Sequence, residues 1–158
     1  MKNFSLALSG LALFFTLVFS GCSSSEPGPT TTTPATKTLK EKITGAKWKV
    51  KTAYEEYSPV YELGSATNKS PNYSKFILDF TNPVTGKLTE VDDSQYSFTL
   101  SVDELKSTLS LSAITPAISG GDYSYTATFN ANDTEVTLVR SAISPKSAKN
   151  IKLVMVKM

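Results

Sequence analysis

The side chains that most often carry catalysis or hold metals are scarce in this sequence of 158 residues. It contains no histidine and a single cysteine, Cys22. Serine–histidine and cysteine–histidine nucleophile systems both need a histidine base, and ordinary zinc sites are built from histidine and cysteine. The sequence therefore excludes these chemistries and predicts no cofactor.

Paired carboxylates remain, because two of them suffice to hydrolyse a glycoside. The candidates are Glu55-Glu56, Asp92-Asp93 and Asp103-Glu104. All three pairs lie in polar or turn-like segments, where solvated surface charge is the ordinary role. The run Asp92-Asp93-Ser94 also lacks the ligand spacing of a calcium loop. We therefore expect no catalytic residue and no metal site, and we predict that the protein is not an enzyme.

The single cysteine follows an apolar segment near the N-terminus. Lys2 supplies a positive charge, and residues 6–19 form an apolar run that is too short to span a bilayer comfortably. Ser20 and Gly21 lead directly into Cys22, which is the arrangement of a processing site rather than of a stop-transfer helix. Cys22 cannot form an internal disulfide, and a free or intermolecular thiol is the alternative interpretation.

This segment resembles the lipobox of bacterial lipoproteins, in which a cysteine after a small residue is lipidated and becomes the first residue. Phe19 departs from the pattern, since leucine is usual three residues before the cysteine. The resemblance implies a signal peptide over residues 1–21, lipidation of Cys22 and a partner in the membrane itself. Each buried methylene contributes about 0.8 kcal/mol, so several acyl chains hold a domain on a membrane permanently. Ser23 after the cysteine implies the outer membrane of a diderm envelope, with the leaflet left open.

The stretch after the cysteine, residues 22–37, is rich in serine, threonine and proline and has no large apolar residue. It predicts a disordered tether with a reach on the order of 20 Å. The remaining residues, 38–158, are expected to form one domain. Removing Lys2 with the signal leaves 15 basic and 14 acidic residues, a net charge of +1, so no nucleic-acid partner is expected.

Residues from Trp48 onward alternate between apolar and polar, which is the period of half-buried strands. The predicted inward faces are Trp48, Val50, Thr52 and Tyr54; Phe76, Leu78 and Phe80; Tyr96, Phe98, Leu100 and Val102; Leu109, Leu111 and Ala113; Tyr123, Tyr125, Ala127 and Phe129; Val136 and Leu138; and Ile151, Leu153 and Met155. With a short strand at 87–91, these make about eight strands. The fold class is therefore all-β, an antiparallel meander that closes as a barrel or folds as an immunoglobulin-like β-sandwich.

Two further segments complete the prediction. Thr38 and Glu41 have the spacing of a capping box, which predicts one helical turn over 38–43 before Gly45. Residues 55–70 are expected to form the longest loop.

The run Gly45-Ala46-Lys47-Trp48 opens the first predicted strand and resembles the start of a lipocalin-like barrel. In that family a tryptophan packs across the closed end of the barrel and an arginine from a late strand stacks on it. The resemblance, which extends to the compact lipocalin-like domains of Bacteroidetes-type lipoproteins, implies a structural plug of Trp48 and Arg140. The alternative is that Arg140 is a solvated residue at a strand end.

An eight-stranded barrel is filled by side chains or holds one small molecule. Tyr54, Tyr57, Tyr61 and Tyr73 cluster around the long loop, and with Phe98 and Tyr125 from the strand faces they are the candidate ligand-binding residues. Two functions stay open. One is an envelope lipoprotein whose barrel binds a small apolar ligand; the other is a ligand-free barrel that binds an envelope protein as an adhesion or inhibitor module.

Overall fold

The computed structural model describes residues 36–69, 73–118, 121–140 and 149–158. This part of the chain is almost entirely β. Its elements are α1 (Leu39–Ile43), β1 (Lys47–Glu55), β2 (Ser58–Glu62), the 3-10 turn η1 (Tyr73–Lys75), β3 (Ile77–Asp79), β4 (Thr85–Thr89), β5 (Gln95–Asp103), β6 (Thr108–Thr115), β7 (Tyr123–Phe129), β8 (Glu135–Arg140) and β9 (Ile151–Lys157). Within the described residues, no helix is both long and apolar enough to cross a membrane.

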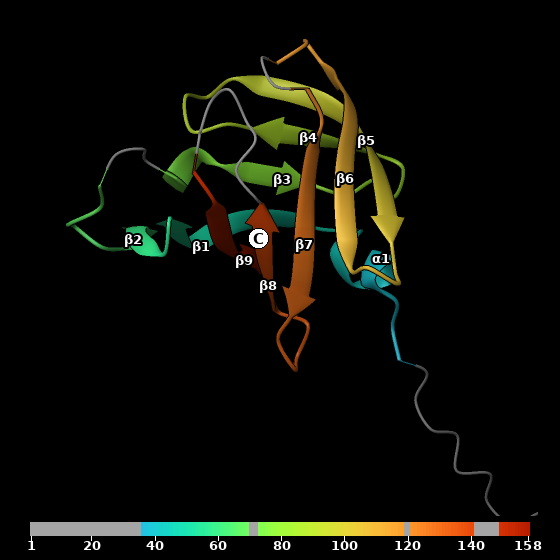
Figure 1. Cartoon of the computed structure of the whole chain (residues 1–158), viewed down its shortest axis with the longest axis horizontal. Coiled ribbons are helices and arrows are strands. Elements are labelled where there is room, and N and C mark those ends of the chain that lie inside the picture. The colour runs from blue at the N-terminus through green and yellow to red at the C-terminus, as the bar shows by residue number, and fades with distance from the viewer. Residues whose placement is uncertain (1–35, 70–72, 119–120, 141–148) are drawn as a thin grey trace, which may run out of the picture. The chain divides into compact units, whose positions relative to one another are not determined.

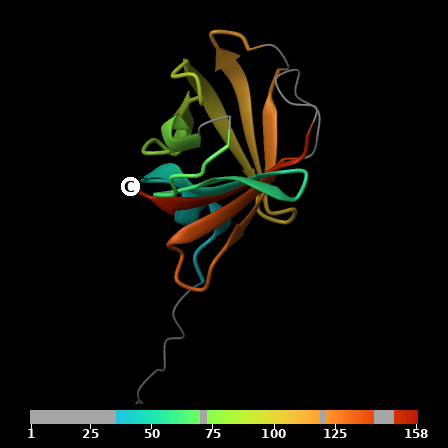
Figure 2. The ribbon, with the colours of Figure 1, turned by 90° about the vertical axis from the view of Figure 1, so that its left-hand side faces the viewer.

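The strands form a closed antiparallel barrel of eight strands, to which β2 adds one more (Figures 1 and 2). Strands β3 to β9 pair in sequence order, and β1 closes the ring because it pairs with both β3 and β9. In the closing pair Trp48 lies opposite Lys157 and Glu55 lies opposite Ile151. The predicted barrel is therefore confirmed, and this closure rules out the two-sheet sandwich.

The helix α1 covers the end of the barrel at which β1 begins, and Figure 1 shows it beside the turn between β5 and β6. Thr38 caps the helix and Glu41 completes the predicted capping box. Glu104 in the β5–β6 turn adds a cap of its own, since its carboxylate accepts from the backbone N–H groups of Leu39 at 2.7 Å and Lys40 at 3.0 Å. These contacts fix α1 to the barrel. We call this end, where Trp48 lies, the closed end.

The core of the barrel is built from the alternating residues of the strands, as the period of two predicts. The indole of Trp48 is fully buried, donates to the carbonyl oxygen of Ile43 at 2.9 Å, and packs edge-on against Phe129. Phe80 and Phe98 form a second edge-on pair further round the wall. Most of the other fully buried positions are aliphatic, among them Leu78, Leu88, Leu109, Leu111, Leu138, Leu153 and Met155.

The inward alternation of β1 breaks near Lys51. The pairing of β1 with β9 slips by one residue between Val50 and Thr52, which is a β-bulge. Beyond the bulge Ala53 is the buried residue, and Tyr54 lies on the outer face. The prediction that Thr52 and Tyr54 face inward is therefore wrong, because one extra residue reverses the faces of all that follow.

Two other local predictions differ from the structure. Ala113 is exposed at a positive φ of 50°, and the register of β5 and β6 shifts nearby, so Ile114 takes the buried position. The predicted long loop over 55–70 contains β2, which forms a hairpin with β1. The strand was missed because only Val60 and Tyr61 carry its apolar signal and Pro59 argues against a strand.

A candidate binding groove on the outer wall of the barrel

The six candidate ligand-binding residues separate into two groups. Tyr61, Tyr73, Phe98 and Tyr125 are buried in the core, where Tyr61 packs on Tyr73 with ring centroids 6.3 Å apart. Tyr125 is 1% exposed and meets the ring of Tyr123 edge-on. These four side chains fill the barrel instead of rimming an opening. Only Tyr54 and Tyr57 lie on the surface side of the barrel.

The predicted contact between Trp48 and Arg140 is wrong. Arg140 pairs with Ile151 at one end of β9, whereas Trp48 pairs with Lys157 at the other end. Six residues of extended strand separate these positions by about 20 Å. The guanidinium of Arg140 lies 4.3 Å from the ring centroid of Tyr123, and the cation over Trp48 is the ammonium of Lys157, at 5.2 Å. The tryptophan closes its end with α1 and Phe129 instead.

The hairpin between β1 and β2 turns at Glu56 and Tyr57, which both have positive φ, 46° and 70°. Two-residue hairpins of this hand favour asparagine and glycine, and a non-glycine residue in this region costs on the order of 1 kcal/mol. The turn is held by Asn150, whose backbone N–H donates to the Glu56 carboxylate at 2.6 Å and whose carbonyl accepts from the Glu56 N–H at 3.1 Å. This clamp fixes a tyrosine that is 90% exposed.

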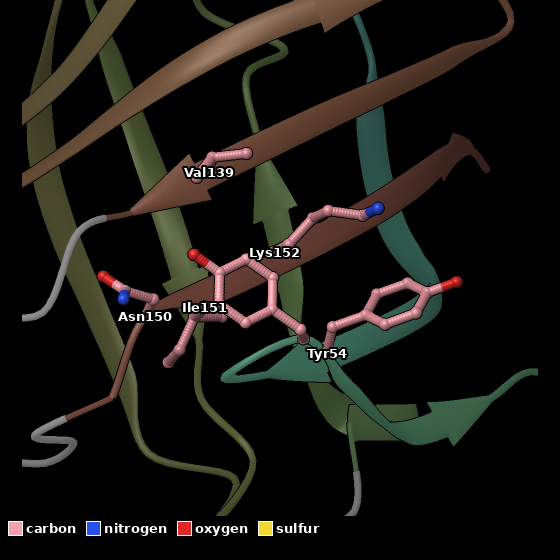
Figure 3. Close-up of a pocket in the computed structure, with 6 residues that line it drawn as sticks. Tyr54, Val139, Asn150, Ile151 and Lys152 are labelled. Atoms are coloured by element: carbon pink, nitrogen blue, oxygen red, sulfur yellow. The ribbon is translucent and has the colours of Figure 1, made fainter.

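Beside this hairpin the outer wall is hollowed into a groove of about 580 Å³. We call it the outer groove, and its lining residues are Tyr54, Tyr57, Val139, Asn150, Ile151 and Lys152 (Figure 3). Tyr54, Lys152 and Val139 are cross-strand neighbours in β1, β9 and β8. The ammonium of Lys152 lies 4.4 Å from the ring centroid of Tyr54. Aromatic faces, two aliphatic side chains and one cation therefore meet in a half-open site.

Inside the barrel, at the end opposite α1, a polar layer covers the core. Its centre is Glu90, which is 8% exposed and accepts a hydrogen bond from the hydroxyl of Tyr123 at 3.1 Å. Glu55 accepts from the Tyr73 hydroxyl at 3.4 Å and pairs with Lys149 at 3.1 Å. Together with Arg140 on Tyr123, these contacts give the charged groups of this layer partners within the barrel.

The phenols of the polar layer are held in their neutral form. Burial raises the pKa of Tyr73, and the nearby charge of Glu55 raises it further. Burial and the carboxylate of Glu90 likewise raise the pKa of Tyr123, and burial raises that of Tyr125. The hydroxyls therefore remain hydrogen-bond donors at neutral pH.

The carboxylates singled out in the sequence take part in local structure. Glu104 caps α1, and Asp103 accepts from the backbone N–H of Lys106 at 3.0 Å. Asp93 pairs with Lys75 across two connections of the barrel. Within the described residues no cluster of three or more acidic or thiol side chains is placed to hold a metal ion. Cys22 lies outside the described residues.

Sequence reasoning missed Lys152, Val139 and Glu90. Lys152 and Val139 looked like ordinary residues on the polar side of their strands, and only the register of β8, β9 and β1 places them beside Tyr54. Glu90 lies in the short strand predicted over 87–91, and only the fold places its carboxylate beside the hydroxyl of Tyr123. The group of tyrosines around the predicted long loop, which includes Tyr54 and Tyr57, was the one available signal.

Comparisons with known proteins add one structural likeness. No family model matches the chain, and no curated protein matches it. Among solved structures, the chain is similar to an uncharacterized protein from Bacteroides eggerthii DSM 20697, with a TM-score of 0.41 and 11% sequence identity. The likeness covers 72% of this chain and 98% of that one.

Proposed function

We propose that this chain is a lipid-anchored protein of the bacterial cell envelope, and that its barrel is a binding module for another envelope protein. Lipidation of Cys22 attaches it to the outer membrane, and the partner binds in the outer groove. This is the second of the two functions that the sequence left open. Neither a cofactor nor catalysis is part of the proposal.

One observation carries the proposal: Tyr57 is almost fully exposed at a strained backbone position. Exposed tyrosines are favoured anchors of protein interfaces, because they bring a large rigid area at a low cost in conformational entropy. A turn that served only to join β1 and β2 would favour asparagine and glycine at Glu56 and Tyr57. Strain that is retained next to a groove supports a role in binding.

The interior of the barrel gives less support to an apolar ligand. Phe98, Tyr123 and Tyr125 project into the core and pack there, and the layer around Glu90 places charge at the end opposite α1. The groove, by contrast, lies on the outer wall at the end of β1 away from α1, where a partner protein can reach it.

Photo-crosslinking in cells that express the full chain tests the proposal. A photoreactive phenylalanine at position 57 should form one adduct with a specific protein, whereas the same residue at the exposed Val84 should not. With the photoreactive residue moved to Val139 in the same groove, Tyr57→Asn should weaken formation of that adduct about tenfold or more. Its unfolding free energy should stay within about 0.5 kcal/mol of the original, because asparagine tolerates positive φ. A radiolabelled fatty acid should label the protein, and Cys22→Ser should remove the label.

Two results would contradict the proposal. One is the same set of adducts from positions 57 and 84, which would mean that Tyr57 marks no specific surface. The other is an apolar molecule retained by the purified protein in native mass spectrometry, which would favour a carrier. Secretion of the mature protein without fatty acid would overturn the anchoring.

A further inference from the structure

The outer wall next to the groove is rich in lysine. We call it the basic wall, and its lysines are Lys47, Lys49, Lys51, Lys87 and Lys152, which lie on β1, β4 and β9. The carboxylates that point outward from these strands and from the neighbouring β2, β3 and β8 are Glu62, Asp79 and Glu135. Five positive charges against three negative ones leave +2, which equals the formal charge of the whole chain.

Ion pairs neutralise only part of this wall. Lys47 pairs with Asp79 at 3.2 Å, and Lys51 pairs with Glu135 at 2.5 Å. In the part of the chain that the structure describes, Lys49, Lys87 and Lys152 have no carboxylate within ion-pair distance. Charge complementarity therefore calls for an anionic partner.

The basic wall is continuous with the outer groove. Tyr54 and Lys152 belong to one cross-strand row, Thr52 and Val154 to the next, and Lys49 and Val156 to the one after that. Opposite residues of antiparallel strands point to the same face, so the half-buried valines of β9 join the groove to Lys49. The surface is thus an apolar strip with lysines along its border.

We propose that the basic wall and the outer groove together bind an acidic, extended segment of a partner protein, with an apolar or aromatic side chain seated between Tyr57 and Val139. This inference rests on the proposed function and names its partner's chemistry. Lys47 and Lys49 are about 7 Å apart along β1, the spacing of side chains at alternate positions of an extended peptide. An acidic polysaccharide would match the lysines, but it has no side chain for the apolar lining of the groove.

Binding of synthetic peptides to the full-length lipoprotein in a neutral detergent tests the inference. The probe is a fluorescent peptide with glutamate at alternate positions and one tryptophan at its end. Two matched peptides replace every glutamate by glutamine or the tryptophan by alanine, and an oligogalacturonate serves as a polysaccharide of similar charge. We expect the glutamate–tryptophan peptide to bind tightest, and its affinity to fall as salt is raised.

Two triple variants distinguish binding at the basic wall from a general effect of the protein's net charge. Surface ion pairs contribute up to about 1 kcal/mol each, so Lys49→Gln/Lys87→Gln/Lys152→Gln should weaken binding about tenfold. The control Lys40→Gln/Lys69→Gln/Lys106→Gln removes the same charge from other surfaces and should change affinity less than about twofold. Equal effects of the two triple variants on peptide affinity would overturn the inference. The peptide would then be held by long-range attraction to the net charge and not by the basic wall.

Three other results would also overturn it. Equal binding of the glutamate and glutamine peptides would exclude an acidic partner. Tighter binding of the oligogalacturonate than of the peptide would indicate a polysaccharide partner. If no peptide bound at all, an acidic peptide segment would be excluded as the partner. In each case a specific adduct from position 57 in cells would still support the proposed function, so the two failures are distinguishable.

Discussion

At the scale of single residues, Gly86 is the glycine of the described residues at which an added side chain would meet close neighbours. It lies on the inner face of β4, opposite Phe98 of β5. A methyl group added there would overlap the ring of Phe98 and come within 2.8 Å of the Asp79 carbonyl oxygen. Gly86 is therefore required by close approach of a neighbouring ring and backbone.

We predict that Gly86→Ala lowers the free energy of unfolding by about 1–3 kcal/mol, the usual cost of overpacking a core. Urea denaturation measures it. Combining the change with Phe98→Leu should cost less than the sum of the two single changes, because the smaller side chain gives the methyl group space. Strict additivity would mean that the clash with Phe98 is not the cause.

From the sequence, the face on which a side chain lies could be predicted wherever the strand keeps its period of two. The prediction failed where a β-bulge inserts one extra residue into the strand. Trp48 and Phe98 are in the core as expected. Tyr54 is not, because the bulge after Val50 depends on pairing with β9, a strand about 100 residues away along the chain. Arg140 does make a cation–π contact, but with Tyr123 instead of Trp48. The register of the strands, and not the residue type, decides which aromatic ring lies beside a cation.

At the scale of elements, α1 depends on a partner outside itself. With five residues it is too short to be stable alone, and most of its stability must come from tertiary contacts. Glu104 supplies the capping contact from a turn more than 60 residues away, at the positive end of the helix dipole.

Glu104→Ala should lower the free energy of unfolding by about 1–2 kcal/mol, since two backbone N–H groups lose their acceptor. Glu104→Gln, which retains one carbonyl oxygen, should cost less. Hydrogen exchange checks the location: the amides of Leu39 and Lys40 should exchange faster, while those of β8 should change only with global stability. Unchanged protection at Leu39 would assign the effect to the turn itself.

Element prediction shows the same limit. The capping box of α1 is encoded within four residues and was predictable, and so were the long strands. The Glu104 cap and β2 were not, because each is stabilised by segments distant in sequence or by backbone pairing that leaves a weak apolar pattern. The outer groove belongs to this second kind, since β1, β2, β8 and β9 must all be in register to form it.

At the scale of the whole molecule, the buried phenols link stability to alkaline pH. The pKa values of Tyr73, Tyr123 and Tyr125 are raised above the ordinary 10.0 mainly by burial. The folded barrel therefore holds protons that the unfolded chain releases. Stability from these groups is complete below pH 10 and is lost as the pH rises above that value.

We expect the free energy of unfolding to be flat from neutral pH to about pH 9 and to fall steeply above about pH 10. Phenolate absorbance followed against pH should show at least three tyrosines that ionise only as near-ultraviolet circular dichroism is lost. Tyr123→Phe should make the decline shallower. Ionisation of all seven tyrosines before any unfolding would contradict the burial described for them.

The closure of the barrel by β1 and β9 determines when this domain can fold during its synthesis. The first strand of the ring cannot gain its second neighbour until residues as far as Lys157 have been made. Until then β1 and β8 both present unpaired backbone edges, which invite association with other chains. A ribosome or export channel that releases the chain from its N-terminus therefore handles an open barrel with two unpaired edges until β9 has been released. Loss of β9, residues 151–157, would be expected to yield aggregates in place of a smaller folded domain.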